Sequence, residues 1–588
     1  MANIVGTLTK DGVQIPLEQL TARLGASFKK VLKSLSVTET VHRGRPTGMA
    51  PVIRRAYKLY PAVQTITIPR MKAAVFLKTK AIDSINASLF AQQARTLPAD
   101  ITESVRELYS YQEAAVSHLC DNVFSDEEIS AGRGVAYLEL GTGLGKSAIG
   151  AAIIAQRQQP GIVVVPTKAI SEQWVDEFTA AFPLMKVAVF NNASKKVCNS
   201  TSHDVIIIVI NTFRDKTPEF LEGFGTIIID EAHELQSKEN SKALWLAQMV
   251  PAVLGLSATP ADRKDGLDKF VTLMLAPVLK PTDIPNFDAA AVQFKNTVRI
   301  VEYSGNDAYT ETAMLSTGTM SAILTVGTVL MDPERLTLVA REVMRLHCLH
   351  ETLPPSELEA VGLGPRPAAA VTKDYPEGEI RRHGVFVFAE TRDFLPILRE
   401  ALLNTGMDQA NIIVPELETP TLDKAELETP TQDKAELETH DARSAGTVSV
   451  LRGGVARTAV GDAKKHKAHI VLTTYGFSRR GISLPDMTAI VLATPRRNGL
   501  TQILGRITRR GGDESILRMI VDIVDVRTGL KGQASDRKAV YKQKGFPIEK
   551  VKVVAEKNIQ TTIEAQTNVE AQTKFVSTNT TELLGMFK

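Results

Sequence analysis

The stretch Val135-Ala-Tyr-Leu-Glu-Leu-Gly-Thr-Gly-Leu-Gly-Lys-Ser147 decides the fold of this chain. It predicts a strand that runs into a glycine-rich loop and then into a helix from Ser147 to Gln156, which is the layout of a phosphate-binding P-loop. Glycines let backbone N–H groups approach phosphate oxygens closely, and the N-terminus of the helix adds partial positive charge. The alternative is a glycine-rich turn followed by a chance Lys-Ser pair, and the flanking strand and helix disfavour it.

Each side chain type in this loop suits a nucleoside di- or triphosphate. Lys146 can reach the β- and γ-phosphates as a point charge, and the Ser147 hydroxyl can ligate Mg²⁺. The loop reads G-T-G-L-G-K-S, one residue tighter than the usual G-x-x-x-x-G-K-[ST]. The residues of this stretch that we expect to bind the nucleotide are Gly141, Thr142, Gly143, Leu144, Gly145, Lys146, Ser147 and Ala148.

A second acidic motif follows the apolar run 226–229, where the chain reads Asp230-Glu-Ala-His233. A carboxylate at the end of a strand can hold the Mg²⁺ that bridges two phosphates, and the adjacent Glu can activate the attacking water. We assign the first role to Asp230 and the second to Glu231; a surface acidic pair is the competing interpretation. Ser257-Ala-Thr-Pro260 is expected to end the next strand but one and to link the nucleotide state to a neighbouring domain.

Length and composition indicate a multidomain globular protein. The chain has 588 residues, of which 44% are hydrophobic and 23% charged, values that are ordinary for globular proteins. There is no run of about 18 apolar residues and no signal-peptide pattern at the N-terminus, so we expect a soluble intracellular protein without a membrane partner. Cys120, Cys198 and Cys348 are far apart, which argues against disulfides and against a zinc cluster.

Charge is distributed unevenly along the chain. The net charge is +3, but residues 1–100 contain 15 Lys/Arg and only 5 Asp/Glu. This basic region suggests a polyanionic partner, with a solvated face or a docking surface for an acidic protein as the alternatives. A tandem repeat that begins Glu416-Leu-Glu-Thr-Pro is acidic and too polar to form a core, so we predict that it is disordered.

Apolar runs that end in polar loops predict two sets of parallel strands with crossover helices. The first set is expected at 135–140, 162–165, 205–210, 226–229 and 253–256, and the second at 385–389, 469–473, 489–493 and 517–523. In region 1–100 we expect a helix over 17–35 and strands at 63–68 and 74–77. The predicted domains are a basic accessory region 1–100, a first domain 101–285, a second domain 286–530 with an insertion at about 415–446, and an extension 531–588 that is partly disordered.

Together these motifs resemble superfamily 2 helicases over about residues 101–525, and their order makes the likeness specific. The matching pieces are Tyr111-Gln112, Pro166-Thr-Lys168, Gln173-Trp174, Val387-Phe-Ala-Glu-Thr391, Thr473-Thr-Tyr-Gly476, Arg480-Gly-Ile-Ser-Leu-Pro485 and Gln502-Ile-Leu-Gly-Arg-Ile-Thr-Arg509. The subgroup is similar to repair and transcription translocases, to phage annealing helicases and to poxvirus-type transcript-release helicases. Ser483 departs from the acidic residue that many relatives carry at that position.

The resemblance implies an α/β fold with two RecA-like domains that share ATP and Mg²⁺ in the cleft between them. It also implies that Gln112 reads adenine, that Arg506 and Arg509 reach the γ-phosphate from the second domain, and that Gln502 lies beside them. His233 belongs to the same nucleotide site. The catalytic set is then Lys146, Asp230, Glu231, Arg506 and Arg509, with Ser147 and Asp230 as metal ligands.

A motor that ignores base sequence should contact mainly the phosphates of a nucleic-acid strand. Our candidates for these contacts are Thr167, Lys168, Thr212, Thr391, Arg392, Thr474 and Arg479.

The sequence leaves three functions as alternatives: an ATP-dependent helicase or translocase, a nucleic-acid-stimulated ATPase that remodels a transcription complex without unwinding, and a scaffold with a degenerate ATPase. The intact ATP-site residues argue against the third. DNA or RNA as substrate, polarity, oligomeric state and partners in transcription or replication stay open. If the protein is viral, host cytoplasm, nucleus and virion are the compartments to consider.

Overall fold

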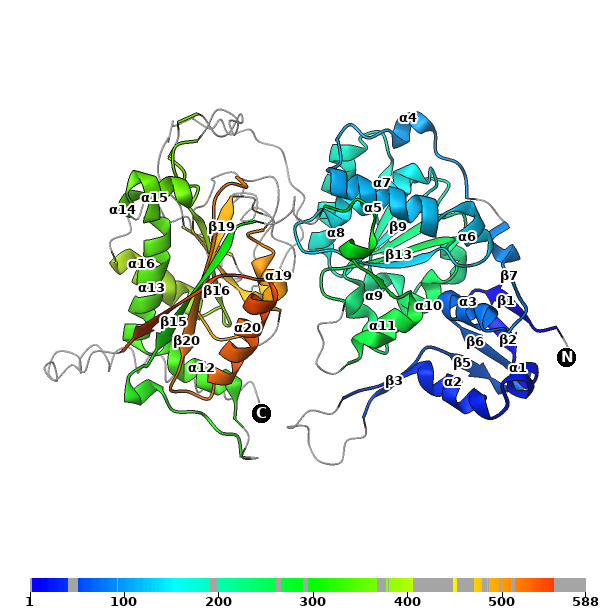
Figure 1. The fold of residues 1–588 in the computed structure, drawn as a ribbon, viewed down its shortest axis with the longest axis horizontal. Helices are drawn as coiled ribbons and strands as arrows, with labels where there is room; N and C mark the ends of the chain where they lie inside the picture. The colour runs from blue at the N-terminus through cyan, green and yellow to red at the C-terminus, as the bar shows by residue number, and fades with distance from the viewer. Residues whose placement is uncertain are drawn as a thin grey trace, which may run out of the picture.

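The computed structural model describes residues 3–40, 51–91, 94–190, 198–260, 266–288, 294–316, 318, 320–366, 377–378, 380–405, 448–451, 470–478, 484, 486–496, 499–508 and 513–554. These residues form two seven-stranded parallel sheets and, in the N-terminal region, a five-stranded sheet and a two-stranded sheet of β3 and β4 (Figure 1). The predicted α/β class with two parallel-sheet domains is confirmed. The acidic repeat at 415–446 and the tail after 554 lie outside the described residues. No helix of the described chain is long and apolar enough to cross a membrane.

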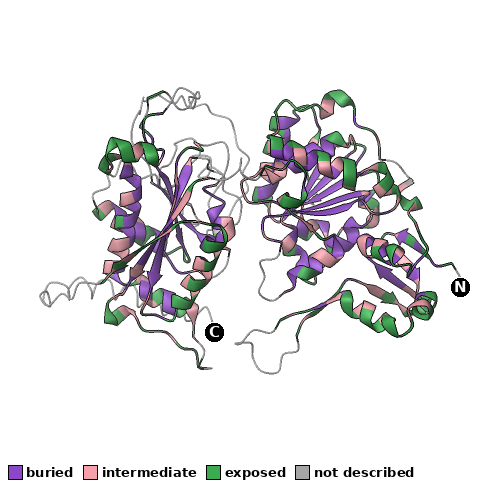
Figure 2. Cartoon of the chain, in the orientation of Figure 1, coloured by how far each residue is buried: buried purple, intermediate pink, exposed green. Residues whose placement is uncertain are grey.

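The first domain is a parallel sheet in the order β10-β11-β9-β12-β13-β8-β14. Its strands are apolar runs that are buried because helices cover both faces (Figure 2). Residues of α5, α7 and α8 pack into the core on one face, and residues of α9, α10 and α11 pack into the core on the other. The elements are β8 Val135–Glu139, β9 Gly161–Val165, β10 Val187–Val189, β11 Val205–Val209, β12 Thr226–Ile229, β13 Ala252–Ser257, β14 Val278–Leu279, α5 Ser110–His118, α7 Lys146–Gln156, α8 Lys168–Ala181, α9 Ile210–Phe213, α10 Ser241–Ala247 and α11 Asp268–Met274.

Two features of this sheet position the candidate site. All seven strands run in parallel, so the loops after β8, β12 and β13 emerge at one edge of the sheet. Strand β13 pairs directly with β12, with Thr226 opposite Ala252. The expectation that Ser257 ends the next strand but one is therefore wrong, because the Ser-Ala-Thr-Pro segment follows the neighbouring strand.

The second domain repeats this plan in the order β17-β18-β16-β19-β20-β15-β21. Helices α13 and α16 pack on one face, and α19 and α20 pack on the other. The elements are β15 Asn296–Tyr303, β16 Gly384–Ala389, β17 Val448–Leu451, β18 Ile470–Thr474, β19 Met487–Leu492, β20 Arg518–Asp525, β21 Ile548–Val553, α13 Pro333–His347, α15 Pro355–Ala360, α16 Phe394–Asn404, α19 Leu500–Leu504 and α20 Lys531–Gln543.

The C-terminal limit of this domain differs from the prediction. Strand β21 pairs in parallel with β15 over six residues, and Tyr541 of α20 is fully buried in the domain core. The domain therefore continues to Val553, and the predicted end at residue 530 is wrong. Strand β21 mixes half-buried and exposed residues at the sheet edge, so it lacks the continuous apolar run that marked the central strands.

Buried ion pairs fix the ends of the central strands in this domain. Arg335 of α13 binds Asp525 at the end of β20 with an Nε–Oδ1 distance of 2.7 Å and donates from Nη1 to the carbonyl of Ala493 at 2.9 Å. Arg537 of α20 binds Asp522, with an Nη2–Oδ1 distance of 2.8 Å. Both buried arginines are thus paired with a carboxylate. These contacts hold the ends of β19 and β20 rigidly, and the loops that follow these strands begin from fixed positions.

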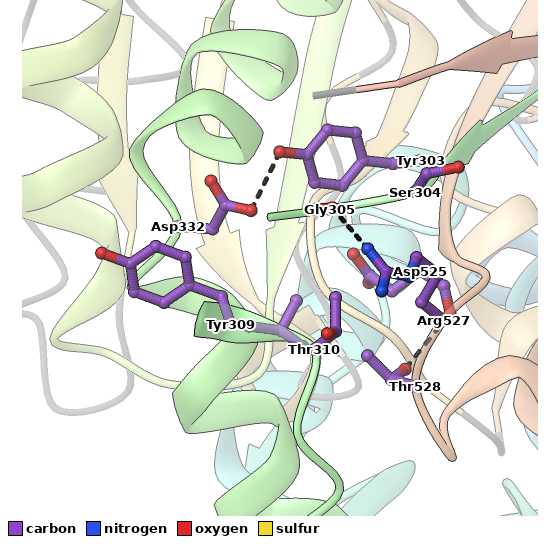
Figure 3. Close-up of a pocket in the computed structure, with 10 residues that line it drawn as sticks. Tyr303, Ser304, Gly305, Tyr309, Thr310, Asp332, Asp525, Arg527 and Thr528 are labelled. Carbon is purple, nitrogen blue, oxygen red and sulfur yellow. Dashed lines mark hydrogen bonds between the residues drawn. The ribbon is translucent and has the colours of Figure 1, made fainter. Parts of the chain in front are cut away.

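A small pocket lies where β15 and β20 end (Figure 3). Its volume is about 190 Å³, including space that is open to solvent. Tyr303 donates its hydroxyl to Asp332 at 2.9 Å, and Arg527 donates to the carbonyl of Gly305 at 3.3 Å. Because Asp525 is already held by Arg335, the charged groups lining the pocket have partners within the protein. We interpret the pocket as a structural feature.

Region 1–91 contains a five-stranded mixed sheet in the order β5-β6-β2-β1-β7. The expected helical stretch at 17–35 and the strand at 65–68 are present, but residues 74–77 are helical rather than extended. Arg70, Ala73 and Phe76 are buried at intervals of three, the helical period that the short apolar run concealed. The elements are β1 Val5–Thr9, β2 Gly12–Pro16, β3 Ser36–Thr38, β4 Ile53–Arg55, β5 Lys58–Tyr60, β6 Thr65–Ile68, β7 Ser84–Asn86, α1 Leu17–Leu24, α2 Phe28–Ser34 and α3 Arg70–Lys78.

This region is packed against the first domain. Arg70 is fully buried, its backbone N–H donates to Gln248 Oε1 at 3.0 Å, and its Nη1 donates to the carbonyl of Pro251 at 3.1 Å. Burial lowers the pKa of Arg70 to about 9. Val37 and Ala56 belong to the same apolar cluster as the strands of the first domain. The accessory region is therefore built into that domain.

Part of the basic charge serves this packing. Lys58 pairs with Asp11 at 2.9 Å and lies 4.7 Å above the ring of Trp245 of the first domain. Arg54 donates from Nε to the carbonyl of Gln236 at 3.1 Å. Exposed positive charge remains on α2, at Lys29, Lys30 and Lys33, where binding of a polyanion stays a prediction.

Candidate active site

The P-loop connects β8 to α7 as the sequence predicts. Gly143 and Gly145 have φ values of 87° and 75°, in the left-handed region that favours glycine. The Leu144 carbonyl accepts hydrogen bonds from the Tyr111 hydroxyl at 3.3 Å and from Gln112 Nε2 at 3.2 Å. Helix α5 therefore holds the loop from outside, through the Tyr111-Gln112 pair.

Gln112 lies directly against the loop and is buried. Its Oε1 accepts the backbone N–H of Tyr109 at 3.0 Å, and a Cβ atom added at Gly145 would collide with its amide. Gln112 therefore lies beside the nucleotide-binding loop. Its contact with adenine stays a prediction.

The acidic motif faces the P-loop lysine. Lys146 Nζ lies 3.2 Å from Glu231 Oε1, and their side chains are only 12% and 18% exposed. Burial alone would raise the pKa of Glu231, but Lys146 and His233 outweigh it and hold that pKa below its usual value. Burial, together with the neighbouring Glu231 carboxylate, raises the pKa of Asp230. The geometry therefore keeps Glu231 ionised at neutral pH, as a general base requires.

Glu231 is also held in an uncommon backbone conformation. Its φ of 49° and ψ of 46° place a residue with a side chain in the left-handed region. Such a conformation costs about 1–3 kcal/mol and persists only where the surroundings enforce it, typically at functional sites. The backbone conformation at Glu231 therefore destabilises the turn after β12, and it sets the direction of the Glu231 carboxylate.

His233 connects the acidic motif to the Ser-Ala-Thr-Pro segment. Its Nδ1 lies 2.9 Å from Ser257 Oγ and 3.2 Å from Glu231 Oε2. Ser257 Oγ in turn accepts the backbone N–H of Thr259 at 3.0 Å. A shift of Glu231 would therefore displace His233 and the loop after β13. This agrees with the expectation that the Ser-Ala-Thr-Pro segment links the nucleotide state to the neighbouring domain.

A contact that the sequence did not reveal holds Asp230. The indole N–H of Trp174 in α8 donates to Asp230 Oδ2 at 3.0 Å, and both side chains are buried. Oδ1 of the same carboxylate accepts the backbone N–H of Glu231 at 2.9 Å. The Gln173-Trp174 pair was noticed as part of the resemblance, but no local pattern connects position 174 with position 230.

The side chains present suit a Mg²⁺ ion bound together with phosphates. Mg²⁺ usually takes one or two protein oxygens and completes its shell with phosphate and water. Asp230 offers one oriented carboxylate at this edge of the sheet, and Ser147 offers a hydroxyl in the first turn of α7. Among the described residues no group of three or more His, Cys, Asp or Glu could hold a metal alone. The site therefore fits a metal that arrives with a nucleotide.

The second domain meets the P-loop at α19, on the side that faces the first domain (Figure 1). A Cβ atom added at Gly505 would overlap the side chain of Thr142, so this glycine lies directly on the loop. Gln502 lies on α19 and is partly exposed, and Arg506 follows the helix and is buried. Arg509 lies outside the described residues. Thus Gln502 and Arg506 belong to the segment that touches the nucleotide-binding loop.

This contact gives a test of domain closure. Gly505→Ala is expected to lower the rate of ATP hydrolysis by up to about 10²-fold, since displacements near 1 Å at a catalytic site can cost that much. Nucleotide binding by the first domain should change little, because the P-loop itself is intact. Steady-state kinetics and nucleotide titration separate the two effects. The matched control is Gly532→Ala in α20, where an added Cβ would meet no atom within 4 Å; equal losses in both variants would contradict the prediction.

The candidates for strand contact gather at the edges where the strands end. Thr167 and Lys168 follow β9 and Thr212 follows β11; these strands are paired neighbours. The Thr167 Oγ1 atom is buried without a hydrogen-bond partner in the described structure, whereas Lys168 is exposed.

The second domain repeats this arrangement. Thr391 and Arg392 are exposed beyond β16, and the neighbouring β18 ends at the buried Thr474. Arg479 lies outside the described residues. Burial makes Thr474 the weakest of the described candidates.

Comparison with known proteins identifies relatives of this chain. The family model described as "Type III restriction enzyme, res subunit" matches residues 106–262. The chain is 36% identical over 541 residues to the African swine fever virus protein named "Putative ATP-dependent RNA helicase QP509L", covering 92% of this chain and 91% of the relative. A shorter match, 29% identical, covers 23% of this chain and 42% of "Putative helicase 109L" of Invertebrate iridescent virus 3.

Among solved structures, T4 UvsW aligns with 94% of this chain and 100% of its own at 16% identity and a TM-score of 0.34. A point variant of S. cerevisiae Dbp5 bound to RNA and ADP BeF3 aligns with 76% of this chain and 90% of its own at 13% identity and a TM-score of 0.44. It is the sequence match over nine-tenths of both chains that establishes kinship. The chain belongs to this family of viral superfamily 2 helicases and is an ATP-dependent helicase with two parallel-sheet α/β domains.

Proposed function

We propose that this helicase hydrolyses ATP with Mg²⁺ in the cleft between its two domains and moves along a single strand of RNA. The observation that carries the proposal is the meeting of three motifs at one place: Lys146 on the P-loop, Glu231 after β12, and Gly505 of the second domain against the loop. RNA is proposed because the viral relative that matches most of the chain is named an RNA helicase.

In this proposal each ATP-site residue has a separate task. Lys146 neutralises the β- and γ-phosphates, and Glu231 accepts a proton from the attacking water. Asp230 and Ser147 would hold a Mg²⁺ ion, which when bound would supply positive charge to the phosphates. Arg506 and Arg509 complete the site only when the second domain closes, so hydrolysis is tied to closure.

The strand is proposed to run over the ends of β9 and β11 and then over the end of β16. These ends belong to two domains that approach and separate during each ATP cycle, so a strand held on both is pulled in steps. Contacts from Thr167, Lys168, Thr212, Thr391 and Arg392 go to the phosphates and ignore the bases. The Lys168 and Arg392 side chains are exposed, as such contacts require.

The proposal is tested by ATPase stimulation with single-stranded RNA, single-stranded DNA and duplex DNA in parallel, at one stated salt concentration. We expect single-stranded RNA to stimulate most. A strand-displacement assay on the same samples separates unwinding from the remodelling of a transcription complex without unwinding. Equal stimulation by all three, or none, would contradict the assignment of a single RNA strand as substrate.

A further inference from the structure

Trp174 occupies a position between the two halves of the ATP site. Its ring is fully buried, and a Cβ atom added at Gly150 of α7 would lie 2.6 Å from the ring carbon Cη2. Gly150 lies one turn beyond Ser147 on the helix that follows the P-loop. The indole therefore touches the P-loop helix with its ring and Asp230 with its N–H. A bulky residue at position 150 would displace it, which explains the glycine there.

The hydrogen bond leaves little freedom to the Asp230 carboxylate. Trp174 Nε1 holds Oδ2 at 3.0 Å, and the backbone N–H of Glu231 holds Oδ1 at 2.9 Å. A carboxylate with one donor on each oxygen presents its remaining lone pairs in fixed directions. Partners of this kind orient the residues that bind a metal, and their loss typically costs about 10- to 100-fold in metal affinity or activity.

Trp174 also links this carboxylate to the proposed strand-binding loop. Helix α8 begins at Lys168, and Trp174 lies six residues further, about 9 Å along the axis at ~1.5 Å per residue. The rest of the helix packs rigidly, with Phe178 fully buried and its ring centroid 6.2 Å from that of Trp174. A displacement of Thr167 or Lys168 on strand binding would therefore move the indole and, with it, Asp230.

We propose that Trp174 is a positioning residue for ATP hydrolysis, which fixes Asp230 through its indole N–H and transmits strand binding at Thr167–Lys168 to that carboxylate through α8. The second half of this proposal rests on the proposed strand path, whereas the first half rests on the hydrogen bond alone. The two halves therefore need separate measurements.

The first measurement concerns the positioning of Asp230. Trp174→Phe keeps an aromatic ring in the core and removes the N–H donor. We expect this variant to need about 10- to 100-fold more Mg²⁺ for tight binding of a fluorescent ADP analogue, with binding unchanged when Mg²⁺ is removed by EDTA. An unchanged Mg²⁺ dependence would overturn the positioning function. Trp245→Phe, at the only other tryptophan of the chain, is the matched control and should behave as the wild type.

A second variant separates the hydrogen bond from packing. In the Trp245→Phe protein, Trp174 can be replaced biosynthetically by benzothienylalanine, which has nearly the shape of tryptophan but no N–H. The same rise in required Mg²⁺ is expected, with a melting temperature close to that of the tryptophan form. If benzothienylalanine restores wild-type Mg²⁺ dependence, Trp174 acts by filling space and the proposal fails.

The second measurement is a double-mutant cycle between Trp174→Phe and Lys168→Ala, with RNA-stimulated ATPase as the readout. If α8 carries the signal, the double variant should lose no more stimulation than the worse of the two single variants. Multiplying losses would overturn the coupling. If RNA does not stimulate even the wild type, the proposed strand path fails, while the Mg²⁺ titration still decides the function of Trp174.

Discussion

Glu231→Gln is expected to bind ATP as tightly as the wild-type protein and to hydrolyse it about 10²- to 10⁴-fold more slowly. Glutamine keeps the shape of the side chain but can no longer accept the proton of the attacking water. The structure supports this expectation, because Lys146 and His233 both lie 3.2 Å from the Glu231 carboxylate and hold its pKa below the usual value.

Single-turnover kinetics and nucleotide titration together check this expectation. The control is Glu234→Gln, three residues further on, where the side chain is exposed and hydrolysis should be unchanged. A folded Glu231→Gln protein that failed to bind ATP would mean that the carboxylate holds nucleotide or metal instead of activating water.

Lys146→Ala should retain the fold and lose turnover by at least about 10³-fold, the upper end of the loss when one charge-stabilising donor is removed. Its ammonium is the cation placed against Glu231, and it also moderates the pKa of Asp230. Without it, the phosphates would lie close to two carboxylates and would lose the cation that the P-loop itself supplies. Nucleotide affinity should fall as well, in contrast to the Glu231 variant.

ATPase assays and a melting curve on the same preparation test this prediction. Lys242→Ala serves as the control, because that lysine lies on the surface of the same domain with its side chain 54% exposed. Near-normal hydrolysis by a folded Lys146→Ala protein would refute the P-loop assignment.

The sequence predicted the central strands and the P-loop well because their signals are local. Continuous apolar runs such as 226–229 can be buried in a parallel sheet, and the glycines at 143 and 145 match the positive φ values of the loop. The chemistry of their two motifs assigns Lys146 and Glu231 to one nucleotide site, and the structure places these side chains in contact.

The elements that were missed depend on contacts between distant residues. Residues 74–77 read as a strand because four apolar residues carry no clear period, whereas the helix is stabilised by the burial of Ala73 and Phe76. Strand β21 lacks a continuous apolar run and falls in the predicted separate extension, although it pairs with a strand about 250 residues earlier. The Trp174–Asp230 bond joins positions 56 residues apart, which no local pattern reports.

The burial of Arg70 against the first domain has a consequence for how the protein folds during its synthesis on the ribosome. Its partner Gln248 lies 178 residues later in the chain, so at roughly 5–20 residues per second it emerges about 10 to 35 s after Arg70. During that interval the N-terminal region exposes Val37 and Ala56, which later enter a shared core. The early chain therefore presents an apolar surface to chaperones, and folding of the first 275 residues is expected to be completed as one unit.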